Sequence, residues 1–243
     1  MKGHFARLLS AALLASLASA AQANNIIIDF EGFAKGTIID DEYSDIGVSI
    51  YGYNKDQSAG NLGVIFDTTE TNTADPDLEA PFYNTDGSNL GVANPGNVLI
   101  IHEHPGECDA YTCGDDPDDE GSKPAGYFNI VFDEAVALNS IDFFDIEYGE
   151  NGNTNKNKIT LTGTETYGQF HTPATGGDNQ WTRLNFNVVG VTSIKIKLHG
   201  SGAIDNINFA RMTVPAPATA LLAFLGMFLI VSRRRPAPAS TAA

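Results

Sequence analysis

Strict alternation of apolar and polar residues marks much of the middle of the chain. In "SIKIKLH" (193–199), the isoleucines and the leucine fall on one face, and the serine, lysines and histidine fall on the other. "GYFNIVF" (126–132) alternates in the same way, with its phenylalanines and isoleucine together. A period of two residues indicates half-buried β-strands, because successive side chains of a strand point to opposite faces.

Other apolar runs are rich in β-branched and aromatic residues and are bounded by Gly, Asn, Asp and Pro, as strands are. They are "NIIIDF" (25–30), "GVSIYGY" (47–53), "LGVIF" (62–66), "NVLII" (97–101), "LNSIDFFDIE" (138–147) and "KITLTG" (158–163). No part of this region sustains a helical period of 3.6 residues. The pattern predicts an all-β domain of about ten short strands, a β-sandwich and most readily a jelly-roll.

The C-terminal end has a different pattern. Residues 214–231 are almost free of charge and begin with Pro215 and Pro217, and three arginines, 233–235, follow. As a helix this stretch would rise about 27 Å, close to the roughly 30 Å of a bilayer core. Arginines beside an apolar span favour the cytoplasmic side. A buried core helix is the alternative, but it leaves the arginines without a partner, so a C-terminal transmembrane helix is favoured.

The N-terminal end indicates export. Lys2 and Arg7 precede an apolar stretch (8–17), and small residues follow it, with "AQA" (21–23) or "ASA" (18–20) as the cleavage site. This is the pattern of a secretory signal peptide. The sequence therefore predicts a signal peptide at 1–23, an extracytoplasmic domain at 24–212, a membrane segment with its arginine cluster at 213–235 and a polar tail at 236–243.

The C-terminal segment resembles the PEP-CTERM sorting signal of Gram-negative bacteria that make extracellular polysaccharide. The matching positions are Val214, Pro215, Pro217, Ala218, Thr219, Arg233, Arg234 and Arg235. Ala216 departs from the family, which most often has Glu there, and residues 236–243 extend beyond the usual end. The resemblance implies export across the inner membrane, a transient membrane anchor, processing by an exosortase-type membrane protease, and delivery to the cell surface or extracellular matrix.

The charge of the predicted domain limits its partners. Residues 24–212 hold all 30 Asp and Glu but only nine Lys and Arg, a formal net charge of −21. This balance argues against nucleic acid, whose phosphates need Lys and Arg, and against anionic lipid surfaces. It favours solubility and divalent cations. Adaptation of a whole proteome to salt is the alternative explanation.

Two acidic loops are candidates for calcium, which takes six to eight oxygen ligands from flexible loops. They are "DTTETNTADPDLEAP" (67–81) and "DDPDDEG" (115–121), and the candidate ligands are Asp67, Asp75, Asp77, Asp118 and Asp119. Their spacing is not that of an EF-hand, and solvated acidic loops remain the alternative. The "DPDL" segment (75–78) is similar to one in β-sandwich domains found beside PEP-CTERM tails.

A second calcium candidate pairs the two ends of the domain. In "GAIDNINF" (202–209), Asp205 shares a face with core residues and so needs a partner or a cation. The opening "FEGFAKG" (30–36) and this closing segment resemble the galactose-binding-like jelly rolls, a fold of many carbohydrate-binding modules. The resemblance implies a structural calcium between the first and last strands, at Glu31 and Asp205.

The two cysteines are five residues apart, and an exported protein is expected to join Cys108 to Cys113. A loop this short gains about 2 kcal/mol from the disulfide. A reactive dithiol is the disfavoured alternative because neither cysteine has a basic neighbour in sequence. His102 and His104 supply only two ligands for zinc, too few for a site.

An enzyme is not expected. "FFDIEYG" (143–149) is similar to the E-x-D-x-E signature of laminarinase-like glycoside hydrolases, with Asp145 and Glu147 at its second and third acids. Phe143 stands where the nucleophile belongs, and retaining hydrolysis needs a pair of carboxyl groups. The glycosidase hypothesis is therefore the least favoured.

Exposed aromatic residues are candidates for binding polysaccharide. Trp181 alternates with Arg183 on a predicted strand, and Tyr51 and Tyr53 are further candidates. A buried tryptophan or an ordinary edge residue is the alternative. Together these features predict an exported, non-catalytic β-sandwich that is calcium-stabilised and binds polysaccharide. A purely structural matrix protein without a ligand is the rival hypothesis.

Overall fold

The structure is a computed structural model that describes residues 24–55, 60–84, 95–114, 116–119, 125–147 and 157–212. These belong to one compact unit, Ala23–Met212. The predicted signal peptide (1–23), the sorting motif with Val214, Pro215, Pro217 and the arginines 233–235, and the polar tail (236–243) lie outside the described residues. Within the described ranges, no helix has the length and apolarity needed to cross a membrane.

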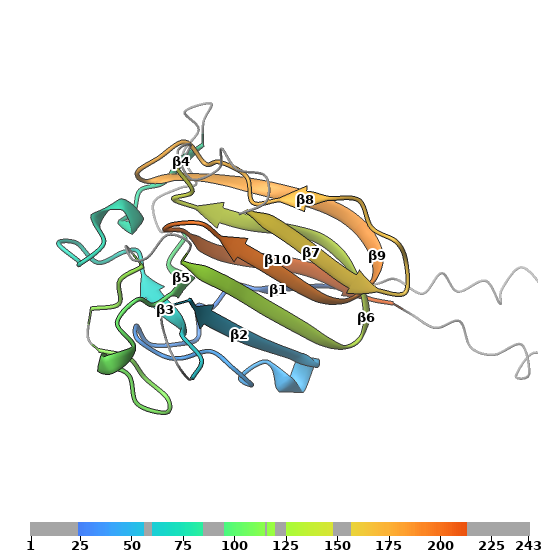
Figure 1. Cartoon of the computed structure of the whole chain (residues 1–243), viewed down its shortest axis with the longest axis horizontal. Helices are drawn as coiled ribbons and strands as arrows, with labels where there is room; N and C mark the ends of the chain where they lie inside the picture. The colour runs from blue at the N-terminus through green and yellow to red at the C-terminus, as the bar shows by residue number, and fades with distance from the viewer. Residues whose placement is uncertain are drawn as a thin grey trace, which may run out of the picture. The chain divides into compact units, whose positions relative to one another are not determined.

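The described chain is all-β (Figure 1), which confirms the predicted class. Its strands are β1 (Asn25–Ile28), β2 (Val48–Asn54), β3 (Gly63–Asp67), β4 (Tyr83–Asn84), β5 (Asn97–Ile101), β6 (Gly126–Phe144), β7 (Lys158–Gly163), β8 (Phe170–His171), β9 (Gln180–Leu198) and β10 (Ala203–Arg211). Three short 3₁₀ turns accompany them: η1 (Ser44–Ile46), η2 (Pro76–Leu78) and η3 (Pro105–Glu107). No α-helix occurs within the described ranges.

The ten strands form one hydrogen-bonded sheet. Seven of them follow the order β3-β5-β10-β6-β9-β7-β8, while β1 pairs with β10, β2 with β6 and β4 with β9. Every pair is antiparallel except the short parallel pair of β4 and β9. The first and last strands of the domain therefore lie side by side, with Asn25 opposite Ala210.

β6 and β9 are each 19 residues long, and the two parts of each strand pair with different neighbours. The first part of β6 pairs with β2 as far as Phe132, and the second part pairs with β10 from Val136. Register shifts between Val131 and Val136 locally disrupt the pairing with β9, and such bulges bend a strand. The alternation predicted two separate strands here; the intervening polar residues form a bulge instead of a turn.

One main core is formed by side chains from both parts of β6 and from the strands that pair with them. Buried side chains of β2 and the first part of β6, such as Ile50 and Phe128, join those of the second part and β10, such as Phe143 and Phe209. A smaller cluster includes Phe66 and Val98 of β3 and β5 together with Leu78 and Phe82. Burying a side chain of this size contributes about 1.5–3 kcal/mol. Leu78 and Phe82 therefore hold the segment around η2 against the sheet.

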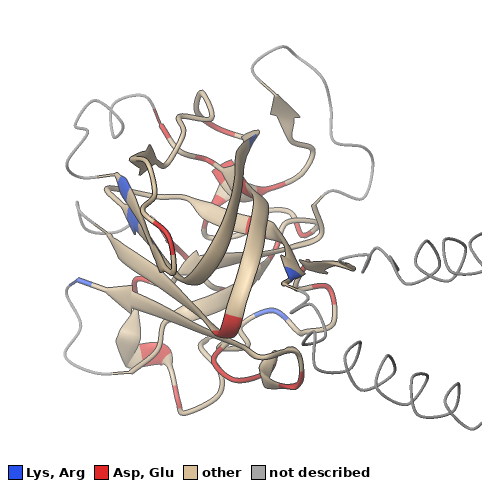
Figure 2. Cartoon of the chain, turned by 90° about the vertical axis from the view of Figure 1, so that its right-hand side faces the viewer, with Lys and Arg blue, Asp and Glu red and all other residues tan. Residues whose placement is uncertain are grey.

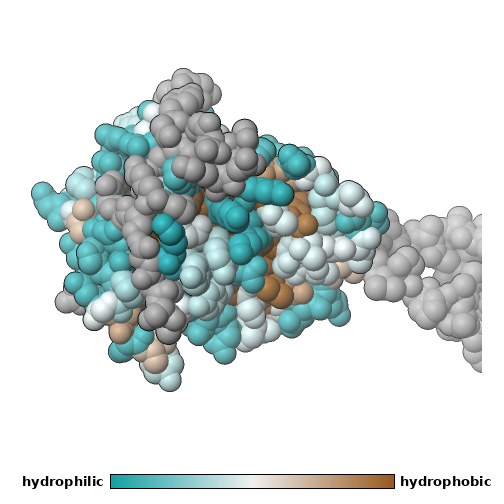
Figure 3. Space-filling view, viewed as in Figure 1, coloured by the Kyte–Doolittle hydropathy of each residue, from teal (hydrophilic) through white to brown (hydrophobic). Residues whose placement is uncertain are grey.

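The surface is mainly hydrophilic in the view of Figure 3. In Figure 2, much of the Asp and Glu lies on loops and at strand ends, whereas Lys and Arg are few. The loops therefore carry much of the negative charge of the domain.

Candidate metal centre

Six aspartates from four separate segments gather at one place, here called the acidic cluster. They are Asp75 and Asp77 around η2, Asp118 and Asp119 in the loop after η3, Asp145 after β6, and Asp178 before β9. Asp75, Asp118 and Asp119 form one group of three in which each offers a carboxylate oxygen within 4.8 Å of the others. Asp77, Asp145 and Asp178 form a second such group.

Local hydrogen bonds bring these segments together. The side-chain amide of Asn179, at the start of β9, donates to the carbonyl oxygens of Pro76 at 3.2 Å, Asp77 at 3.2 Å and Glu79 at 2.5 Å. Asn179 thereby fixes η2 to β9. Asp145 directly follows β6 with a φ of 49°. Asp is one of the few residues other than Gly that enter this left-handed region readily.

A second set of contacts places Asp118. The amide of Asp118 donates to Nδ1 of His102 at 3.2 Å, and the amide of Glu103 donates to the carbonyl of Asp118 at 3.0 Å. His102 is fully buried directly after β5, so the loop is attached to the core of the domain. Burial lowers the pKa of His102, which favours the neutral ring that can accept this hydrogen bond.

Three of the six carboxylates are buried and incompletely hydrogen-bonded. Asp75 is 0 % exposed, Asp119 2 % and Asp145 1 %. Asp119 Oδ2 accepts from the amide of Gly202 at 2.6 Å, and Asp145 Oδ2 accepts from Ser201 Oγ at 3.2 Å. Both oxygens of Asp75 and the Oδ1 atoms of Asp119 and Asp145 lack a hydrogen-bond partner of good geometry within the described residues, although the backbone amides of Asp77 and Leu78 lie near enough to Asp75 to lower its pKa somewhat. Buried polar atoms without partners are rare and need an explanation.

Burial is the main cause of strongly shifted pKa values in the acidic cluster. It raises the pKa of Asp119 well above the ordinary value, and the charge of Asp75 raises it further. Burial also raises the pKa of Asp75. Asp145 reaches a pKa of about 8, through burial and then the charges of Asp75 and Asp77. No lysine or arginine is among the main causes of these shifts, and no ion pair between described residues involves a member of the cluster.

Repulsion within the acidic cluster is large enough to require compensation. Two unit charges 4.8 Å apart repel by about 3.5 kcal/mol at an effective dielectric constant near 20. At neutral pH the carboxyl groups must therefore either keep protons, one of which Asp75 and Asp119 can share, or surround a cation. The donor set is entirely oxygen, which suits a hard cation such as calcium and lacks the nitrogen and sulfur ligands that zinc favours.

Four of the predicted calcium ligands lie in this cluster. Asp75 and Asp77 come from one predicted loop and Asp118 and Asp119 from the other, so the structure joins two candidates that the sequence kept apart. Asp67 lies outside both groups and instead closes a turn, where its Oδ1 accepts from the amide of Thr69 at 2.9 Å. Calcium binding by these residues remains a prediction.

Sequence reasoning missed two members. Asp145 was considered only as part of a glycosidase signature, and its position at the end of a buried run is the signal that could have suggested a loop ligand. Asp178 follows two glycines in a turn, and no feature of that segment marks it as a ligand.

The predicted site between the first and last strands has a different geometry. Asp205 is buried, as its alternation predicted, and its pKa is raised to about 9, mainly by burial and also by the charges of Asp142 and Glu31. Glu31 Oε1 accepts from the amide of Asn97 at 2.8 Å. Within the described residues, Glu31 and Asp205 belong to no group of three ligands as close as those of the acidic cluster.

The predicted sugar-binding residues lie on two different parts of the sheet. Arg183 forms two hydrogen bonds, of 2.6 and 2.7 Å, with the fully buried carboxylate of Asp142 on the neighbouring strand. Trp181 packs partly buried against the smaller core cluster. Tyr51 and Tyr53 lie on β2, which pairs with the first part of β6, whereas Trp181 and Arg183 pair with its second part.

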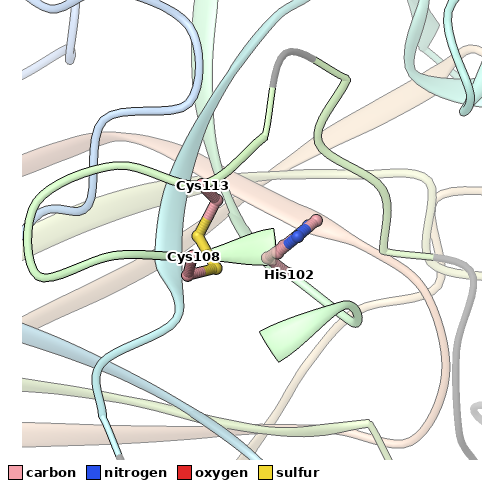
Figure 4. Close-up of side chains that lie close together, drawn as sticks. All are labelled: His102, Cys108 and Cys113. Carbon is pink, nitrogen blue, oxygen red and sulfur yellow. A yellow bond between two sulfur atoms is a disulfide. The ribbon is translucent and has the colours of Figure 1, made fainter. Parts of the chain in front are cut away.

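Cys108 and Cys113 form a disulfide beside His102 (Figure 4), as predicted for an exported protein. The Nε2 atom of His102 is buried without a hydrogen-bond partner. Because both sulfur atoms are bonded to each other, neither offers a thiolate, so these three residues do not form a metal site in the oxidised protein.

The described chain is thus an all-β protein with an antiparallel sheet, and its acidic cluster is formed by segments that connect the strands. Comparisons with protein-family models and with curated proteins found no match for this chain.

Proposed function

We propose that the protein is an exported, non-catalytic β-sandwich of the jelly-roll, galactose-binding-like type, stabilised by calcium and sorted by a PEP-CTERM-like tail. In this proposal it crosses the inner membrane of a Gram-negative bacterium, is anchored there until an exosortase-type protease acts, and reaches the cell surface or matrix. The observation that supports calcium most strongly is the acidic cluster. Its three buried aspartates have four oxygen atoms without hydrogen-bond partners.

A divalent cation would relieve the cluster in the simplest way. It would replace repulsion of about 3.5 kcal/mol between each close pair with attraction, and the unpartnered oxygens would become ligands. The first group takes its ligands from the segment around η2 and the loop after η3, and the second from η2, the end of β6 and the turn before β9. Cations bound in the two groups would therefore link four parts of the chain. Extracellular calcium modules commonly bind with Kd values of about 0.1–1 mM, which fits a protein that works outside the cell.

Export is supported from a separate direction. The disulfide between Cys108 and Cys113 is typical of proteins that fold in an oxidising compartment. The excess of carboxylates over basic residues in the domain also argues against a nucleic-acid partner. In this proposal the chain ends meet the inner membrane and the protease, and the folded domain lies outside the cytoplasm.

The surroundings of Asp145 favour a binding role over catalysis. Asp145 is 1 % exposed and lies inside the acidic cluster, and Phe143, at the position of the missing nucleophile, is fully buried in the core. A glycosidase needs two carboxyl groups that flank a sugar. Asp145 is buried among other carboxylates, which leaves it no open surface on which to flank a sugar and supports a role in holding a cation.

The test is a calcium titration of the purified full-length chain in mild detergent, followed by isothermal calorimetry and thermal melting. At a free calcium concentration 100 times the Kd, binding to the native state alone adds about 2.7 kcal/mol. For a domain of this size that raises the melting temperature by about 5–10 °C. The variant Asp119→Asn should lose most of this gain, whereas Asp45→Asn, an exposed residue outside the cluster, should keep it. An identical melting temperature in excess calcium and in EDTA would rule out the calcium proposal and favour a structural protein without a ligand.

A further inference from the structure

One face of the sheet differs in charge from the rest of the domain. It is the outer face of β2, the first part of β6 (126–132), the second part of β9 (191–198) and β7, whose inner faces contribute Ile50, Ile130, Ile194 and Ile159 to the main core. Its outward side chains include Tyr51, Tyr53, Tyr127, Lys158, Lys195 and Lys197, here called the lysine–tyrosine face.

The register places these six residues in neighbouring rows. Tyr53 lies opposite Tyr127, and Tyr127 lies opposite Lys197. One row along, Tyr51 and Lys195 both lie opposite the same residue of β6, Asn129. Because residues directly opposite each other on adjacent strands share a face, the tyrosines of β2 and the lysines of β9 lie on the same surface, on either side of β6.

The charge of this face is the reverse of that of the domain. The four paired segments, 48–54, 126–132, 158–163 and 191–198, contain three of the nine Lys and Arg of the domain and none of its 30 Asp and Glu. Lys158 and Lys197 are exposed, and neither they nor Lys195 forms an ion pair with any described residue. Three ammonium groups on a strongly acidic domain are therefore available to an anionic partner.

The aromatic side chains on this face are already ordered. The rings of Tyr53 and Tyr127 stack with their centroids 4.9 Å apart. Lys195 Nζ lies 3.4 Å from the centroid of the Tyr127 ring, a cation–π contact. The hydroxyl of Tyr51 donates to the carbonyl of Gly60 at 2.6 Å, and 37 % of the residue remains exposed. Ordered side chains lose little conformational entropy when a ligand binds.

We propose that the lysine–tyrosine face binds a carboxylated polysaccharide. Lysines on adjacent strands or on alternate positions of one strand stand about 5–7 Å apart, which provides a few separated positive charges. That arrangement suits a polymer with one carboxylate on some of its sugar units, and exposed tyrosine can contact the apolar face of a sugar ring. Double-stranded DNA carries a charge about every 1.7 Å, and three lysines on a domain of net charge −21 are too few to hold it.

This inference rests on the proposed export of the domain, since it needs a ligand found outside the cell, but it is independent of the acidic cluster.

The test is affinity electrophoresis of the full-length chain in gels that contain hyaluronan, a soluble carboxylated polysaccharide. Dextran provides an uncharged polysaccharide, and polyglutamate provides a carboxylated polymer without sugars. The double variant Lys195→Gln/Lys197→Gln removes two ammonium groups, and Lys35→Gln, whose lysine pairs with Glu70 elsewhere, is the matched control.

We expect hyaluronan to retard the wild type and the Lys35→Gln variant, and dextran and polyglutamate not to do so. The double variant should bind at least about fivefold more weakly, and Tyr51→Ala should also bind more weakly. No retardation by hyaluronan, equal retardation by polyglutamate, or an unaffected double variant would overturn the inference. Calcium-dependent melting of the same samples reports on the acidic cluster separately, so loss of one result leaves the other intact.

Discussion

Replacing Asp75 with Asn should change the stability of the domain in opposite directions with and without calcium. The Asp75 carboxylate is fully buried, and an oxygen of it lies within 4.8 Å of oxygens of Asp118 and Asp119. Each such pair of charges repels by about 3.5 kcal/mol, and protonation relieves part of this at pH 8. The neutral amide removes the remainder and can donate to the free Oδ1 of Asp119. We therefore expect Asp75→Asn to stabilise the calcium-free protein by about 2 kcal/mol.

With calcium bound the same change should be harmful. An amide offers one neutral oxygen in place of a charged carboxylate, so the variant should bind calcium weakly and lose most of the 2.7 kcal/mol or so that binding supplies at 100 times the Kd. Urea unfolding at pH 8, in EDTA and in excess calcium, measures both differences. Asp45→Asn is the control and should change neither. If Asp75→Asn shifts the unfolding free energy in the same direction in both conditions, the acidic cluster is not a cation site.

Three further predictions follow from the described contacts. Asp145 has a pKa of about 8 in the fold and an ordinary pKa near 4 when the chain is unfolded. In EDTA its contribution to stability is therefore complete below about pH 4 and is lost as the pH rises through 8. Melting curves from pH 4 to 9 should show this loss in EDTA and not in calcium, and equal curves would contradict the prediction. Arg183→Met leaves the fully buried Asp142 unpaired and should lower the free energy of unfolding in urea by about 3–5 kcal/mol. The double variant Arg183→Met/Asp142→Asn should recover most of this loss, and no recovery would contradict the role of the pair. Gly52→Ala would press its Cβ against the backbone of Gly63 and should lower the melting temperature by several degrees, at about 2–4 °C for each kcal/mol, whereas Ser49→Ala on the same strand should not.

Alternation along the chain was enough to locate most strands but not to connect them. The segments 126–132 and 138–147 were each predicted as a strand, and their apolar faces are buried as expected. Residues 133–137 are polar at first and look like a turn. They continue the strand because β9 pairs with β6 on both sides of the bend, up to Val131 and again from Val136. A partner that pairs across a bulge cannot be read from one sequence.

The candidate site was predictable only in part, for a similar reason. Asp75, Asp77, Asp118 and Asp119 are conspicuous because they lie in acidic loops, but their meeting depends on Asn179 and His102, whose hydrogen bonds are long-range. The lysines of "SIKIKLH" are evident as one face of a strand. That tyrosines from β2 share this face depends on the order of the strands in the sheet.

If the proposed C-terminal anchor holds the domain, the position of β10 has a mechanical consequence. β10 pairs with β6 on one edge at both of its ends, with a register shift between Asp205 and Asn208, and with β1 and β5 on the other edge. A pull applied beyond Arg211 therefore enters the domain through an interior strand. Hydrogen bonds on both edges of that strand would share the load.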